Sequence, residues 1–334
     1  LHDWSHFIAL QPEEIDSERG VIMEELRTRD NASWRSTMKM LQALGKGTKY
    51  EHRNLIGYLD GLKGFQHKEL EDFYNTWYRP DYQAVVIVGD IDVDAVENKL
   101  KTLMSDIPAP AADAAQEEPI VSIYTDPEMQ GSRVQVFVKR PAVPEQYNNL
   151  VYGEMLDVVQ AYMTTMENAR LQEISMQPDA PFLGAGMNSG SIGVIPTLEA
   201  TTFVAMTQDG KLTQGFEALY TEMEKVRRHG FTQGEFERAQ NDLMRRAERS
   251  YTNRNDRRNA EFVQTYLDNF QQNRPMPDAK TEWQLDSMLI KALNVEAVNA
   301  FAQQAIYPNN QVIVITAPEK EGVENPTAEE ILAI

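Results

Sequence analysis

Two glutamates seven residues apart, Glu18 and Glu25, are the side chains of this chain best suited to chemistry. They belong to the run Glu18-Arg-Gly-Val-Ile-Met-Glu-Glu25-Leu26. Seven residues make two turns of an α-helix, so both carboxylates are expected on one face. Catalytic zinc can take one carboxylate as its third protein ligand beside two histidines. The pair therefore predicts half of a zinc site, and the histidine half must come from elsewhere.

The histidines of this chain do not supply that half. His2 and His6 have the i, i+4 spacing that binds zinc on a helix, but no glutamate stands between them as a general base. The nearby Trp4 and Phe7 favour ordinary packing for that segment. The remaining three histidines stand alone in the sequence and are expected at the surface: His52, His67 and His229.

Two further patterns favour structural interpretations. The glycines of the segment 182–193 do not follow a strand–helix phosphate motif and predict a Gly-rich loop or a bulged strand. A basic cluster in the second half of the chain predicts a solvated helix face without a catalytic role. Its members are Arg246, Arg249, Tyr251 and Arg254.

Composition excludes several classes of protein. The formal net charge of −19 argues against a nucleic-acid partner, because phosphates require a basic surface. No apolar run reaches the length of a membrane span. The absence of cysteine excludes disulfides and thiolate metal sites. Composition does not fix the compartment, and we favour a bacterial envelope or periplasm over the cytoplasm. The start at Leu1, without methionine or leader, predicts an internal fragment.

A sequence pattern of a helix, a proline and a strand occurs twice in the chain. Residues 70–77 carry an apolar helix stripe that ends before Pro80, and residues 84–88 predict a buried strand. The same order leads to Pro308 and to a strand at residues 311–315, at an offset of 228. A second similarity lies upstream: residues 14–23 match residues 235–244 at an offset of 221. We infer a duplicated domain, although any helix–proline–strand unit shares part of this pattern.

The duplication sets the predicted domains. Residues 1–106 are the C-terminal part of an active-site-type domain that has lost about a hundred residues of its opening half. Residues 107–119, rich in Pro, Ala and acidic side chains, are a linker, and residues 120–334 are a complete second domain. The second copy mixes strands near 134–138 and 201–205 with helices at 149–177 and beyond, without strict βαβ alternation. This order predicts an α+β fold of two homologous domains, each an antiparallel sheet with helices packed on one face.

The copies differ at the glutamate pair. The second copy has Ala239 and Arg246 where the first has Glu18 and Glu25. A pair that served only solubility could be replaced by any charged residue, so this difference favours a specialised role in the first copy.

Together, the Glu18–Glu25 run, Asp30, the aromatic helix Phe73–Pro80 and the strand Val85–Asp90 resemble the pitrilysin/insulinase family of zinc metallopeptidases. These are the inverzincins, which have an H-x-x-E-H motif. The resemblance implies that Glu25 is the third zinc ligand and that Glu18 orients a ligand from the second shell. It also implies peptide substrates and a second clamshell half. No H-x-x-E-H occurs in this chain; it is expected seventy to eighty residues before Glu25.

The first interpretation is therefore a fragment of a zinc metalloendopeptidase, which is inactive by itself because the histidines and the general-base glutamate are missing. The alternative is a non-catalytic homologue that acts as a scaffold or partner subunit. A generic peptide-binding module is a third interpretation. The presence of both Glu18 and Glu25 favours the enzyme, because a scaffold does not need that pair.

Overall fold

The computed structural model describes residues 7–54, 56–78, 85–103, 120–192, 198–308 and 310–334. The chain forms two compact units. Unit 1 contains Leu1–Asp30, Asn54–Ala114 and Asp256–Met276, and unit 2 contains Asn31–Arg53, Ala115–Asn255 and Pro277–Ile334. Three predicted features lie outside the described residues: the His2/His6 pair, Pro80 and the linker 107–119.

Unit 2 is built on a mixed five-stranded sheet with the order β1-β5-β2-β4-β3. The strands are β1 (Ile120–Asp126), β2 (Ser132–Pro141), β3 (Gly184–Ser191), β4 (Leu198–Thr207) and β5 (Gln311–Pro318). Only β1 and β5 pair in parallel, and the other three pairings are antiparallel. The α+β class is confirmed, and the Gly-rich segment, predicted as a loop or a bulged strand, forms the edge strand β3.

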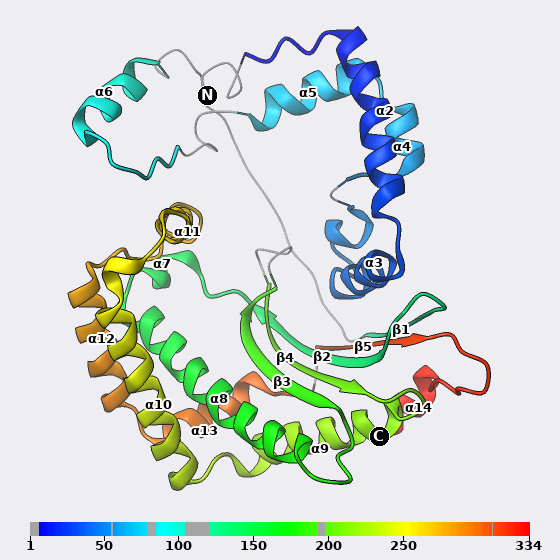
Figure 1. Ribbon diagram of the computed structural model, residues 1–334, viewed down its shortest axis with the longest axis vertical. Coiled ribbons are helices and arrows are strands. Elements are labelled where there is room, and N and C mark those ends of the chain that lie inside the picture. Colours follow the sequence, from blue (N-terminus) through cyan, green and yellow to red (C-terminus); the bar gives the residue numbers. More distant parts are fainter. Residues whose placement is uncertain (1–6, 55, 79–84, 104–119, 193–197, 309) are drawn as a thin grey trace. The chain divides into compact units, whose positions relative to one another are not determined.

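Alternation along the strands separates the two faces of the sheet. On β2, Val134, Val136 and Val138 are fully buried on one face, whereas Phe137 and Lys139 point to the other, as the two-residue period of a strand requires. The first face meets α8, α9, α10, α12 and α13 in one large core, as Figure 1 shows. These helices span Val151–Ser175, Leu212–His229, Gln233–Thr252, Ala279–Ala292 and Val295–Ala305.

The opposite face of the sheet is covered by α3 (Ala32–Leu44), which comes from the N-terminal part of the chain (Figure 1). Asn31 caps this helix by accepting a hydrogen bond from the Trp34 N–H. Ala43 and Leu44 pack with Phe137 in a second, smaller core. The sequence predicted helices on only one face of the sheet. That prediction is incomplete, because α3 covers the opposite face.

Unit 1 is helical in its described residues. Its helices are α2 (Pro12–Arg29), α4 (Leu59–Gly64), α5 (His67–Trp77), α6 (Val93–Leu103) and α11 (Asn259–Gln272). Asp92 caps α6, with its Oδ1 accepting a hydrogen bond from the Ala95 N–H. No helix among the described residues is both long and apolar enough to cross a membrane.

The buried strand predicted at residues 84–88 is wrong for the part that the structure describes. Residues 85–88 are in no strand, and Val85 and Ile87 are exposed. Their counterparts in the second copy, Ile313 and Ile315, lie in β5, which pairs with strands on both sides. A strand is stable only with partners, and none of the described strands lies in unit 1.

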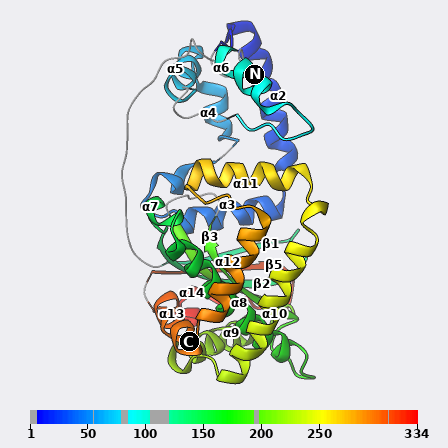
Figure 2. The same cartoon turned by 90° about the vertical axis from the view of Figure 1, so that its left-hand side faces the viewer.

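Helix bounds follow the duplication. The first residues of α2 and α10 differ by the offset of 221, and both ends of α5 and α13 differ by 228. Likewise α3 and α11 have related positions, starting at Ala32 and Asn259. These last two helices are exchanged, because α3 belongs to unit 2 and α11 to unit 1. The short helices α7 (Glu145–Asn148) and α14 (Ala328–Leu332) also belong to unit 2 (Figure 2).

Candidate functional site

The helix α2 carries both predicted site residues. Pro12 occupies its first turn, where the missing N–H costs nothing, and Glu13 and Glu14 complement the positive end of the helix dipole. Arg27 and Arg29 complement the other end. Because the helix is continuous, Glu18 and Glu25 lie on one face, separated by about 10 Å along the axis.

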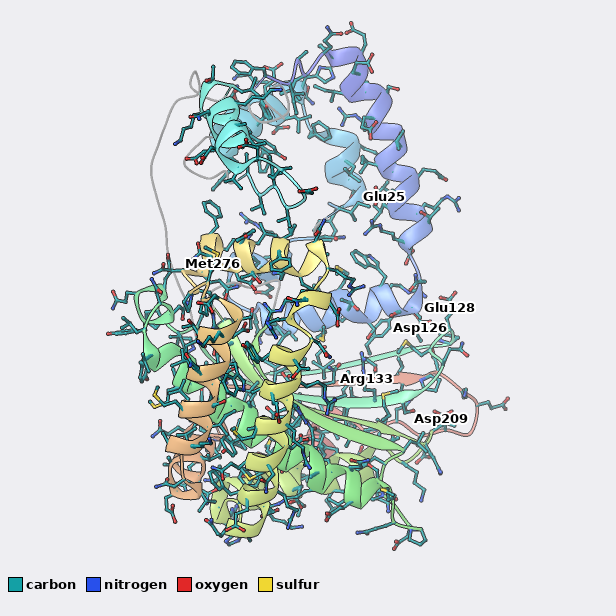
Figure 3. The ribbon with its side chains drawn as sticks, turned by 60° about the vertical axis from the view of Figure 1, so that its left-hand side comes forward. Glu25, Asp126, Glu128, Arg133, Asp209 and Met276 are labelled. Carbon is teal, nitrogen blue, oxygen red and sulfur yellow. The ribbon has the colours of Figure 1, made fainter. Side chains whose placement is uncertain are left out.

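Glu25 lies near the C-terminal end of α2, where Figure 3 labels it. Its carboxylate forms an ion pair with the guanidinium of Arg29 at 2.5 Å. The Glu25 side chain is 40% exposed, so solvent screens this pair and its energy is small. The Arg29 contact is thus easily exchanged for a stronger partner such as a metal ion.

Glu18 lines a cavity of about 710 Å³ within unit 1. The wall of this cavity is mainly apolar and includes Ile15, Ile22, Leu62 and Phe65. The Glu18 carboxylate has no hydrogen-bond or ion-pair partner within the described part of the chain. Burying a carboxylate on an apolar wall costs free energy unless the group that buries it also supplies a hydrogen bond or a positive charge.

A polar cluster fastens α2 to the segment 59–77. Arg19 donates to the backbone oxygens of Leu62 at 2.5 Å and Phe65 at 3.1 Å, and its guanidinium lies 3.9 Å from the Phe65 ring centroid. Asp16 contacts His67 Nε2 at 2.9 Å and Arg19 at 3.2 Å. The hydrogen bonds from His67 and then Arg19 lower the pKa of Asp16. His67, predicted as a solitary surface residue, is therefore part of this cluster.

The residues present do not form a zinc site by themselves. No group of three or more His, Asp or Glu side chains that could hold a metal ion occurs among the described residues. Glu25 offers one ligand, while zinc in a protein needs three or four. His52 is 82% exposed beside Glu51, as expected for a surface histidine. Any metal chemistry of α2 must therefore use ligands that this part of the chain does not contain.

The basic cluster of the second half has local partners. Arg246 pairs with Asp242, one turn earlier on α10. The Arg254 guanidinium lies 4.4 Å from the ring centroid of Tyr251, which stacks on Trp283 at 5.1 Å. These contacts agree with the predicted solvated helix face.

One ionisable cluster was not anticipated from the sequence. Glu167 of α8 is fully buried, and neither of its carboxylate oxygens has a hydrogen-bond partner in the described structure. Burial, together with the charge of Glu222, raises its pKa to about 8. Arg170 contacts Glu222 at 3.3 Å and Glu235 at 2.5 Å, but it does not contact Glu167. The sequence does contain one indication of this burial. Glu167 lies on the apolar face of α8, among Tyr162, Met163, Met166 and Leu171.

The five-stranded sheet and the helices that cover it place the chain in the α+β class. The sequence family described as "Peptidase M16 inactive domain" matches residues 64–243. This chain belongs to that family, and the resemblance to pitrilysin/insulinase peptidases is confirmed.

Individual relatives agree with this assignment. The "Probable zinc protease PqqL" of Escherichia coli is 26% identical over 244 residues, which are 70% of this chain and 26% of that protein. The "Zinc protease PQQL-like" of Arabidopsis thaliana is 25% identical over 317 residues, which are 91% of this chain and 29% of that protein. This chain therefore spans less than a third of the length of these relatives.

Solved structures give the same fold. The crystal structure of the first half of the periplasmic protease PqqL from Escherichia coli matches with a TM-score of 0.82 at 22% identity, covering 99% of this chain and 72% of that one. A predicted insulinase family protease from Yersinia pestis matches with a TM-score of 0.75 at 14% identity, covering 99% of this chain and 71% of that one.

Proposed function

We propose that the full-length protein containing this chain is a zinc metalloendopeptidase that hydrolyses peptides. Glu25 is its third zinc ligand, and Glu18 supports a ligand from the second shell. The observation that carries this proposal is the glutamate pair on one face of α2, which the duplicated helix α10 replaces by Ala239 and Arg246. The zinc-protease names of the relatives support the same chemistry.

This chain alone has no catalytic centre in that proposal. Zinc would polarise a peptide carbonyl and activate water, and both tasks require the ion to be held by further ligands. The histidines and the general base belong to a segment with the H-x-x-E-H motif, outside residues 1–334. We place residues 1–106 in the active-site-type domain, residues 107–119 in a linker and residues 120–334 in the second domain.

Substrate and location follow from the same family. Peptides are expected to be enclosed between this half and a second clamshell half. The similar PqqL of Escherichia coli is a periplasmic protease, which supports a bacterial envelope for the full-length protein.

A non-catalytic scaffold is the second candidate. The family description "inactive domain" supports this candidate. Sequencing the coding DNA upstream of the Leu1 codon separates the two candidates. An in-frame H-x-x-E-H seventy to eighty codons before Glu25 supports the peptidase, and a homologous domain with those positions replaced supports the scaffold.

A further inference from the structure

Arg133 of β2 carries a partly buried positive charge on the face of the unit 2 sheet that α3 covers in part. It precedes Phe137 by four residues, so the two side chains point to the same face. Its guanidinium forms no hydrogen bond, ion pair or ring contact within the described part of the chain. Figure 3 labels Arg133 among the strands of unit 2. Burial alone lowers the pKa of this guanidinium, so no neighbouring charge compensates for the water that it has lost.

Two other arginines at this sheet are paired with carboxylates. Arg140, on the same strand but on the opposite face, has its Nη2 atom 2.8 Å from Glu199 Oε2. Arg35 of α3 has its Nη2 atom 2.8 Å from Asp126 Oδ2. Such pairs form because a charge that leaves water without a counter-charge costs free energy. Arg133 lacks the carboxylate that the other two have.

The neighbours of Arg133 on its own face do not supply a partner. Thr316 of β5 is its register partner on one side, and Gln135 follows it by two residues on β2. Thr316 Oγ1 and Gln135 Oε1 are buried and have no hydrogen-bond partner in the described structure. The register partner on the other side is Met206 of β4, which is apolar. The partner of the guanidinium must therefore come from outside these strands.

The sheet is open on the side of Arg133 that faces β4 and β3. Val312 and Val314 of β5, which pack with α3 residues, are 0% and 2% exposed. Met206, beside Arg133 on the same face, is 44% exposed, and Asn188 of β3 is exposed too. An extended segment of chain therefore has access to Arg133 over β4.

We propose that Arg133 binds an aspartate or glutamate side chain of a peptide that lies on this open part of the sheet. The proposal rests on the proposed function in taking peptides as ligands, and it names acidic peptides as their class. A carboxylate accepts two parallel hydrogen bonds from a guanidinium, which makes the pair strong and directional. The net charge of −19 repels acidic peptides only weakly beyond the Debye length, which is about 8 Å at physiological ionic strength. The local pair with Arg133 then decides binding.

Peptide capture tests this assignment. Residues 1–334 are immobilised and offered an equimolar mixture of heptapeptides whose central residue is Asp, Glu, Asn or Gln and whose other positions vary. The retained peptides are quantified by mass spectrometry. We expect peptides with central Asp or Glu to be enriched about tenfold over those with Asn or Gln, because hydrogen bonds between two charged groups are stronger than those to a neutral amide.

Two variants separate Arg133 from positive charge in general. Arg133→Met keeps the apolar stem and should abolish the enrichment. Arg238→Met should leave it unchanged, because Arg238 is an exposed arginine of α10 that also has no partner among the described residues. The melting temperature of Arg133→Met should not fall below that of the wild type, because the lost cation had no partner. If the methionine variant does not fold, Arg133→Gln replaces it and should abolish the enrichment in the same way.

Several results would overturn the proposal. These are the absence of enrichment in the wild type, unchanged enrichment in Arg133→Met, equal loss in Arg238→Met, and a lower melting temperature of Arg133→Met, which would reveal a partner within the chain. Capture is repeated with the full-length protein in a zinc chelator, which prevents cleavage. Enrichment by residues 1–334 that the full-length protein lacks would identify a carboxylate of the remaining chain as the occupant. Capture does not need zinc, so its outcome is independent of whether Glu25 is a zinc ligand.

Discussion

Arg35 and Asp126 lie far apart in the sequence, yet the Arg35 Nη2 atom is 2.8 Å from Asp126 Oδ2. The Tyr124 hydroxyl donates to the same carboxylate at 2.5 Å, and Glu128 accepts from Arg35 at 2.8 Å. Figure 3 labels Asp126, the last residue of β1, and Glu128, which follows the strand, close together. This network fastens α3, a helix from the N-terminal part of the chain, to an edge strand of the unit 2 sheet.

Loss of the Arg35 guanidinium should therefore loosen α3. In Arg35→Met the backbone amides of residues 32–44 should exchange with deuterium about tenfold faster, because hydrogen bonds to charged partners are removed while the apolar stem remains. Lys39→Met, on the exposed side of the same helix, is the matched control. Unchanged protection in Arg35→Met would mean that the apolar contacts of Leu44 alone hold the helix.

The buried Glu167 should make unit 2 less stable at alkaline pH. Its pKa is raised from 4.5 to about 8, so the folded state holds a proton that the unfolded state releases. The free energy of unfolding then falls as pH rises from 4.5 to 8 and levels off above 8. Glu167→Gln removes this titration and should stabilise the chain by about 3 kcal/mol at pH 7.

Urea unfolding of wild type and Glu167→Gln at pH 5, 7 and 8.5 measures this difference. The gain from the substitution should grow with pH, because glutamine resembles the protonated glutamate at every pH. Glu237→Gln, on an exposed position of α10, is the control and should leave the pH profile of the wild type. A gain in Glu167→Gln that is independent of pH would contradict the raised pKa.

Equivalent aromatic residues of the two copies should differ in their effect on stability. Phe301 of α13 packs against the main core, whereas its counterpart Phe73 of α5 is 55% exposed. In the isolated chain, Phe301→Ala should lower the free energy of unfolding by about 2 kcal/mol, and Phe73→Ala should change it by less than about 0.5 kcal/mol. Equal losses in the two variants would show that unit 1 already buries its aromatic helix.

Much of the fold was predictable where local pattern and burial agree. The valines of β2 alternate and α8 has a long apolar stripe, so these two elements were predicted near their observed positions. Residues 85–88 have an equally clear strand pattern but form no strand, because strand formation depends on partners that the pattern does not contain.

The candidate site was also predictable only where it depends on local sequence. Glu18 and Glu25 share a helix, so their common face follows from spacing alone. The burial of Glu167 and the contact of Arg35 with Asp126 depend on the packing of distant segments, and local sequence does not encode either. The exchange of α3 and α11 between the units likewise lies beyond any local pattern.

The supporting role of Glu18 is testable in the full-length protein. Glu18→Gln should weaken zinc binding about ten- to a hundredfold, as expected for a second-shell partner, and competition with a zinc chelator measures the change. Glu24→Gln is the matched control, because Glu24 is exposed on the same helix and pairs with Arg27. Equal affinities in Glu18→Gln and Glu24→Gln would remove Glu18 from the site.

The most direct test of the account is the zinc content of the full-length protein with and without Glu25. The purified wild-type protein and Glu25→Gln are compared by elemental analysis after dialysis. A third ligand predicts about one zinc ion per wild-type polypeptide and a sharp loss of both metal and peptidase rate in Glu25→Gln. Undiminished zinc in Glu25→Gln would contradict the central claim, because the carboxylate of α2 would then not be a ligand.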